Sequence, residues 1–124
     1  MANAKKLDCT WPKARLEPRR LRVADDYLQG VLDGKNFLVF DGAMGTQLQA
    51  RGLAAGELPE LLCLTNPEEV TQIHAAYVAA GADVVTTNTF GANQDKLGTA
   101  ATVEEIFDAA VACARRSGAR RGAG

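Results

Sequence analysis

The chain has 124 residues, of which 47% are hydrophobic and 23% charged, a composition typical of one soluble globular domain rather than a disordered or fibrous chain. Its formal net charge of −1 provides no overall field that would attract nucleic acid. A run of about 18 apolar residues is absent, and no apolar stretch follows the basic start, so the sequence predicts neither a membrane span nor a secretory signal.

The charge is unevenly distributed along the chain. Residues 1–36 carry a net charge of +3, whereas residues 37–116 carry −6. We interpret the basic ends as solvated flanks rather than as a nucleic-acid arm. The sequence therefore predicts a flexible or helical N-terminal extension over residues 1–33, with a short helix over Val23–Leu32, and a disordered tail over 119–124.

Two buried strands with a helix between them are predicted in the middle of the chain. The continuous apolar run Phe37–Phe40 and the β-branched run Val84–Thr87 are each too short for a helix and are typical of strands in a parallel sheet. Pro67, with acidic residues after it, marks the start of the intervening helix, and Gly81 marks its end. Further helices are predicted over 47–51 and, after a capping box at Thr102–Glu105, up to residue 116.

This order of elements forms a βα unit followed by a second βα unit, and the two predicted strands would be parallel. Two strands are too few for a stable sheet of this kind. We therefore expect residues 34–118 to be part of a larger α/β fold rather than a finished domain.

Polar and glycine-rich loops follow both predicted strands. In parallel α/β folds ligands bind at the carboxyl ends of the strands. Asp41 can hold an ammonium group, and the backbone N–H groups near Gly42 and Gly45 can hold a carboxylate. Asn88 and Thr89 add donors and acceptors from the second loop. This arrangement suits the α-amino-acid end of a small ligand, although composition alone favours a purely structural turn. The glycine spacing fits neither nucleotide-binding pattern, GxGxxG or GxxxxGK[ST].

Three motifs follow one another in the chain: FLVFDGAMGTQLQARGL, LTNPEEVTQIHAAYVAAGADVVTTNTFGAN and KL. In these motifs the sequence resembles the amino-terminal part of homocysteine S-methyltransferase domains. The match extends from about Phe37 to about Arg116, and its form is most similar to the methionine-synthase branch. The resemblance implies a (β/α)₈ TIM barrel, which needs roughly 200 residues or more. The expected fold is therefore the first two βα units of such a barrel.

The resemblance also implies a substrate, a reaction and a set of substrate-binding residues. The substrate is homocysteine, whose thiolate accepts a methyl group to give methionine. Asp41 would contact its amino group and the turn from Gly42 to Thr46 its carboxylate, with the second loop lining the pocket. The full predicted set is Asp41, Gly42, Ala43, Met44, Gly45, Thr46, Asn88 and Thr89.

In the family, zinc activates the homocysteine sulfur, and three cysteines from later strands bind it. None of Cys9, Cys63 and Cys113 matches those ligands, and Cys113 fits a small core residue. A catalytic zinc needs about three protein ligands, so we expect this chain alone to be inactive. The methyl donor stays open, with cobalamin as one cofactor that similar full-length enzymes use.

Two alternatives to an enzyme fragment remain open at this stage. One is a non-catalytic assembly module that pairs with the rest of a barrel, or with itself, through open strand edges. The other is a small anion-binding α/β domain. His74 is interpreted as a residue at the border of a helix rather than as a base or a ligand.

Overall fold

The computed structural model describes residues 21–118. Its elements, in chain order, are α1 (Asp26–Leu32), α2 (Gly45–Ala50), η1 (Pro59–Leu61), α3 (Leu62–Thr65), α4 (Pro67–Ala79), α5 (Gln94–Leu97) and α6 (Val103–Arg116). The predictions for residues 1–20 and 119–124 lie outside this range. None of the described helices is both long enough and apolar enough to cross a membrane.

The predicted fold of two βα units is wrong for this part of the chain, because residues 21–118 contain helices but no strand. The two apolar runs meet only at an isolated parallel bridge between Phe40 and Val84. A strand buried on both faces needs neighbours that bond its backbone and cover its side chains. The backbone condition is not met because the two runs share only that isolated bridge. The side-chain condition is not met because Phe37 and Phe40 are 74% and 61% exposed.

Three backbone hydrogen bonds nevertheless hold these two extended segments together. Val39 O accepts from the N–H groups of Asp83 and Val84, at 2.7 and 3.2 Å, and Asp41 N donates to Val84 O at 2.9 Å. The Asp83 carboxylate also accepts from Val39 N at 2.9 Å. The bridge therefore places the chain after Phe40 beside the chain after Val84.

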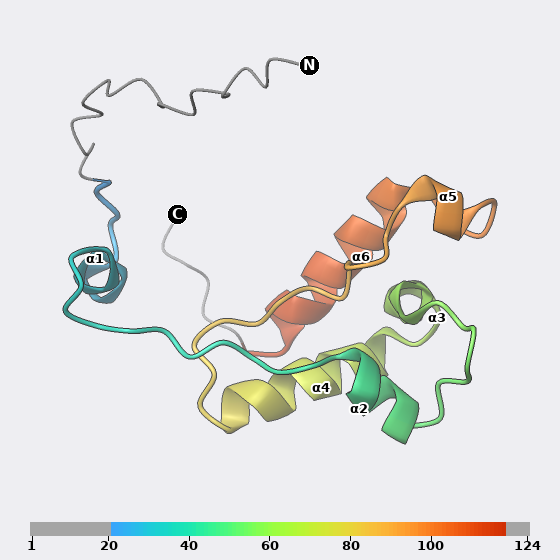
Figure 1. The fold of residues 1–124 in the computed structure, drawn as a ribbon, viewed down its shortest axis with the longest axis horizontal. Helices are drawn as coiled ribbons and strands as arrows, with labels where there is room; N and C mark the ends of the chain where they lie inside the picture. The colour runs from blue at the N-terminus through green and yellow to red at the C-terminus, as the bar shows by residue number, and fades with distance from the viewer. Residues whose placement is uncertain (1–20, 119–124) are drawn as a thin grey trace, which may run out of the picture.

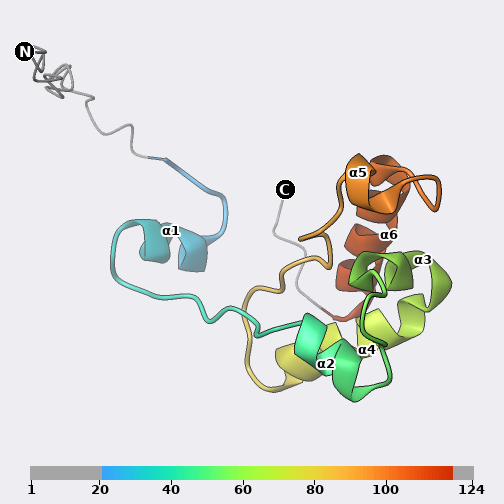
Figure 2. The same cartoon turned by 45° about the vertical axis from the view of Figure 1, so that its right-hand side comes forward.

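The core lies where α3, α4 and α6 pack together, with α2 against them (Figures 1 and 2). Its main cluster contains the buried side chains of Leu48, Cys63, Val70, Ile73, Ala110 and Cys113. A second cluster, formed by Leu97, Ala101 and Ile106, joins the end of α5 to the first turn of α6. In contrast, α1 has no buried residue and stands apart from the other helices in both views.

The predicted ends of α4 and α6 are confirmed. Pro67 occupies the first turn of α4, and Gly81 follows it with φ = 107°, a conformation that favours glycine. Thr102 and Glu105 form the predicted capping box of α6. The hydroxyl of Thr102 accepts from Glu105 N at 3.2 Å, and the Glu105 carboxylate accepts from Thr102 N at 2.9 Å. Local sequence therefore sets these helices, which position the two loops described next.

Candidate functional site

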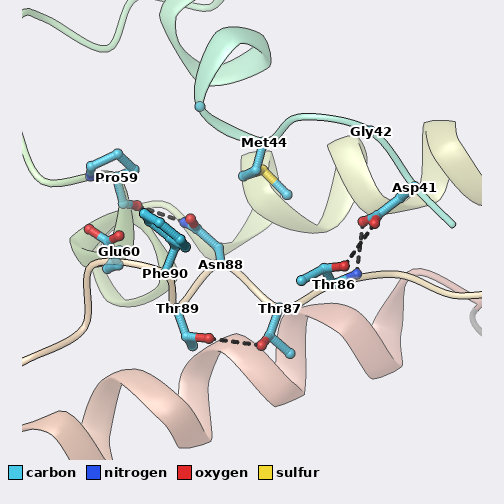
Figure 3. Close-up of a pocket in the computed structure, with 11 residues that line it drawn as sticks. Asp41, Gly42, Met44, Pro59, Glu60, Thr86, Thr87, Asn88, Thr89 and Phe90 are labelled. Carbon is cyan, nitrogen blue, oxygen red and sulfur yellow. Dashed lines mark hydrogen bonds between the residues drawn. The ribbon is translucent and has the colours of Figure 1, made fainter. Parts of the chain in front are cut away.

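A cavity of about 380 Å³ opens where the loop after Phe40 and the loop after Val85 come together (Figure 3). Its walls also include the start of η1. The lining residues are Asp41, Gly42, Met44, Gly45, Pro59, Glu60, Thr86, Thr87, Asn88, Thr89 and Phe90. This set contains two carboxylates and neither lysine nor arginine, so it favours a ligand with a positively charged group.

The Asp41 carboxylate is fixed by one residue of the opposite loop. Thr86 donates its backbone N–H to Oδ2 at 2.8 Å and its hydroxyl to Oδ1 at 3.0 Å (Figure 3). The Asp41 side chain is only 4% exposed. Because each carboxylate oxygen has further lone pairs, Asp41 is held in one orientation and can still accept a hydrogen bond from a ligand.

Helix α4 supports the Asp41 loop from the interior through two side chains one turn apart. The Tyr77 hydroxyl donates to Ala43 O at 2.9 Å, and its oxygen would lie 2.8 Å from a Cβ atom at position 42. Gly42 is therefore required by the close approach of Tyr77, a reason that the sequence does not reveal.

His74 is the second of these α4 side chains, and its predicted place at the helix border is wrong. The side chain is fully buried, with Nδ1 4.0 Å from Asp41 Oδ2. Burial lowers the pKa of His74 below its ordinary value, and the nearby Asp41 carboxylate opposes that shift. At neutral pH the imidazole is therefore uncharged.

Asn88 ties the second loop to η1 and α3. Its side-chain nitrogen donates to Pro59 O at 2.8 Å and lies 3.6 Å from Cys63 Sγ. The Cys63 thiol in turn lies 3.7 Å from Asn88 O. The amide nitrogen of Asn88 is thus already engaged, which leaves its oxygen as the group available to a ligand.

Glu60 is a site residue that the sequence analysis missed. It is buried, and its Oε1 accepts from Gly91 N at 2.6 Å, which joins η1 to the second loop. A Cβ atom at position 91 would come within 2.6 Å of the same oxygen. The only signal in the sequence is an acidic residue in the apolar stretch from Leu58 to Leu64, since a charge there needs a buried partner.

The structure brings most of the predicted binding residues to one cavity. Asp41, Gly42, Met44, Gly45, Asn88 and Thr89 all line it. Ala43 and Thr46 are not lining residues; Ala43 contributes the carbonyl that Tyr77 contacts, and Thr46 is exposed on α2. The roles of all eight residues in substrate binding stay predictions.

The described part of the chain does not fit a zinc ion. Residues 21–118 contain no group of three His, Cys, Asp or Glu side chains placed to hold a metal. Burial raises the pKa of Cys63 to about 12, whereas zinc binds the thiolate. The thiol of Cys113 lies 3.5 Å from Pro67 O as a hydrogen-bond donor. We therefore derive no step through a metal from these residues.

A comparison with known protein families decides the ancestry of the chain. The family model described as homocysteine S-methyltransferase matches residues 38–123. The chain belongs to this family. The match includes both loops of the cavity and the helices that support them.

Two curated relatives share this region. The chain is 44% identical over 77 residues to the methionine synthase of Mycobacterium tuberculosis and 43% identical over 77 residues to that of Mycobacterium leprae. In each case the match covers 57% of this chain and 6% of the relative. The region of similarity is thus a small part of a much longer protein in these relatives.

Proposed function

We propose that the cavity binds the amino-acid end of homocysteine and that the chain contributes this site to a methyl transfer that gives methionine. Membership in the homocysteine S-methyltransferase family supports the substrate, and relatives named methionine synthase support the product. The observation that carries the proposal is a fixed, nearly buried carboxylate, Asp41, in the wall of a cavity that contains no cationic side chain among the described residues.

In this proposal Asp41 accepts a hydrogen bond from the ligand's ammonium group. Thr86 already holds the carboxylate, so binding does not need to reorient it. The second carboxylate, Glu60, adds to the negative potential without competing for Asp41, since it bonds Gly91 N. A charged hydrogen bond of this kind is stronger than a neutral one.

The ligand's carboxylate would lie against the turn from Gly42 to Thr46. The backbone N–H groups of Gly42, Ala43 and Met44 donate no backbone hydrogen bond to the described residues. Backbone N–H groups are strong donors, and unpaired ones near a cavity attract anions. Met44 and Phe90 supply apolar surface beside these polar groups, where the methylene groups and sulfur of homocysteine would lie.

We also propose that the chain does not catalyse methyl transfer by itself. The reaction needs the homocysteine thiolate, and a nearby cation lowers the pKa of a thiol, whereas nearby carboxylates raise it. The cavity offers Asp41 and Glu60 and, among its described lining residues, no cation. The group that activates the sulfur, zinc in the family, would have to be bound by residues other than those described.

Binding of homocysteine and of two truncated analogues tests this function. Isothermal titration of the 124-residue chain would use L-homocysteine, 4-sulfanylbutanoate, which lacks the amino group, and 3-sulfanylpropylamine, which lacks the carboxylate. We expect saturable binding of homocysteine and a loss of about tenfold or more for 4-sulfanylbutanoate. Equal affinity for homocysteine and 4-sulfanylbutanoate, or no binding of homocysteine, would contradict the proposal.

An assembly role is a second candidate, favoured by the exposed Phe37 and Phe40 side chains on either side of Val39. We propose a second copy of the chain as the partner, because most backbone groups of segment 37–40 form no hydrogen bond with the described residues and could pair with another chain. Sedimentation velocity would show concentration-dependent dimers, and Phe37→Lys would abolish them. A monomer at all concentrations would exclude this role. A small anion-binding module is disfavoured by the two carboxylates of the cavity.

A further inference from the structure

His74 is a buried polar group without a hydrogen bond. Its side chain is 0% exposed, and among the described residues neither Nδ1 nor Nε2 has a partner. Buried polar side chains almost always have at least one partner, so such an exception calls for an explanation. If His74 only filled space in the core, an apolar side chain of similar size would stabilise the fold more.

The nearest charged group is the carboxylate that the proposed function assigns to the ligand. His74 Nδ1 lies 4.0 Å from Asp41 Oδ2. This distance is too long for a hydrogen bond and lies at the outer limit for an ion pair, which can form once the imidazole is protonated. Asp41 lines the cavity and His74 does not. The imidazole therefore meets the carboxylate from the protein interior.

We propose that His74 is a positioning residue whose protonated form competes with the ligand's ammonium group for the Asp41 carboxylate, so that ligand binding depends on its protonation. This inference rests on the proposed function, since it assumes a cationic ligand at Asp41. When His74 is neutral, the full charge of Asp41 faces the cavity. When His74 is protonated, the imidazolium offsets that charge from the interior side of Asp41, and the affinity for the cationic ligand falls.

Among the described residues, Asp41 is the one charged group that influences His74, and the Glu60 carboxylate on η1 bonds Gly91 N instead. On α3, Cys63 is an uncharged thiol, its pKa raised to about 12 by burial. On α6, the buried Cys113 thiol lies 3.5 Å from a backbone carbonyl. The charged side chains of α6 are all exposed to solvent: Glu104, Glu105, Asp108, Arg115 and Arg116. On α4 itself, Glu68 is exposed and Glu69 accepts from the Asn66 side chain at 2.9 Å, at the opposite end from Tyr77.

The coupling must act in both directions. If protonation of His74 weakens ligand binding, a bound ammonium group must lower the pKa of His74 by the same free energy. Acid therefore lowers affinity, and ligand keeps His74 neutral to lower pH. The ligand's own ammonium group stays charged at every pH below 7.0, so it does not produce this dependence.

The chain offers an unusually direct test, because His74 is its only histidine. Imidazole NMR signals followed against pH give its pKa without assignment. We expect that pKa to fall in Asp41→Asn, which removes the nearby negative charge while keeping the shape, and to stay unchanged in the matched control Asp108→Asn. An unchanged pKa in Asp41→Asn would overturn the inference, whether or not homocysteine binds.

Calorimetry then tests the effect on the ligand. From pH 7.0 down to one pH unit below the His74 pKa that NMR gives, we expect the affinity of the wild-type chain for L-homocysteine to fall about fivefold or more, and that of His74→Gln to change much less. NMR of the wild type saturated with homocysteine should give a lower His74 pKa than the free chain. Identical pH profiles for wild type and His74→Gln would overturn the inference. Absence of homocysteine binding at every pH would overturn the proposed function instead. The NMR pKa of His74 in Asp41→Asn would still decide whether His74 and Asp41 are coupled.

Discussion

Asp41 and Thr86, 45 positions apart in the sequence, form a two-point contact in which both carboxylate oxygens accept hydrogen bonds from a single residue. The backbone N–H of Thr86 supplies one donor and its hydroxyl the other. This contact exists because the bridge between Phe40 and Val84 aligns the two loops. It turns a flexible acidic side chain into a fixed acceptor at the cavity wall.

Thr86→Val should weaken homocysteine binding without abolishing it. The change removes the hydroxyl donor and keeps the backbone donor, so one neutral-to-charged hydrogen bond is lost and Asp41 is less well oriented. We expect a loss of up to about tenfold, equivalent to about 1.4 kcal/mol, measured by calorimetry. The matched control is Thr71→Val on α4, whose hydroxyl donates to Pro67 O away from the cavity. Equal losses in both variants would contradict a role for the Asp41–Thr86 contact.

Gly42→Ala should destabilise the fold, whereas Gly45→Ala should not. A Cβ atom at position 42 would lie 2.8 Å from the Tyr77 hydroxyl oxygen, while one at position 45 has no atom within 4 Å. We expect Gly42→Ala to lower the free energy of unfolding by about 1–3 kcal/mol through overpacking. Gly45→Ala, at the start of α2, should be neutral or stabilising by up to about 1 kcal/mol. Urea denaturation gives both values, and a similar effect at the two positions would show that Tyr77 does not restrict this loop.

Substitutions of Glu60 should separate its structural role from its charge. Glu60→Gln keeps an oxygen that can accept from Gly91 N, so stability should stay close to that of the wild type while homocysteine affinity falls. Glu60→Ala leaves that buried N–H group without a partner and should cost about 1–3 kcal/mol of stability. Thermal unfolding and calorimetry measure the two effects. Unchanged affinity in Glu60→Gln would mean that the second carboxylate does not contribute to ligand binding.

Stability should fall as the pH drops below about 6.5, through His74. The pKa of His74 in the folded chain lies below its ordinary value of 6.5. Between these two pKa values the unfolded chain binds more protons than the folded chain, so the free energy of unfolding decreases as pH decreases. Denaturation midpoints measured from pH 7.5 to 5.5 should decline less in His74→Gln than in the wild type. A steeper decline in the variant would contradict a buried, neutral imidazole.

Cys63 and Cys113 should resist alkylation in the folded chain. Both thiols are buried from the reagent. Burial also raises the pKa of Cys63 to about 12, so almost none of this thiol is ionised at neutral pH. Iodoacetamide labelling followed by peptide mass spectrometry should modify neither residue until denaturant is added. Rapid labelling of Cys63 in native buffer would show that α3 does not pack against α6 and the loop at Asn88 as described.

Local features of the sequence predicted α4 and α6 well, because capping residues and apolar spacing act within the helix itself. Thr102 and Glu105 form their capping box without help from the rest of the chain. The two predicted strands failed for the opposite reason. A strand depends on neighbours, and Phe37 and Phe40 remain exposed because nothing in the described chain covers them.

Residues of the candidate site could be predicted where a single segment of the sequence indicates them. They could not be predicted where two segments far apart in the sequence have to pack together. The sequence indicated Asp41 and Asn88 because each follows an apolar run, and the structure places both at one cavity. His74, Glu60 and Thr86 acquire their surroundings only when α4, η1 and the second loop come together. No spacing within one segment encodes a 4.0 Å approach between residues 33 positions apart.

The most direct test of the account compares the dissociation constant of L-homocysteine for the wild-type chain with that for Asp41→Asn, with Asp108→Asn on the exposed face of α6 as the control for net charge. If Asp41 holds the ammonium group, the constant should rise by about 10- to 100-fold in Asp41→Asn, as expected for loss of a charged hydrogen bond of about 1.5–3 kcal/mol, and should stay unchanged in Asp108→Asn. Wild-type affinity in an Asp41→Asn chain that melts at the wild-type temperature would contradict the account.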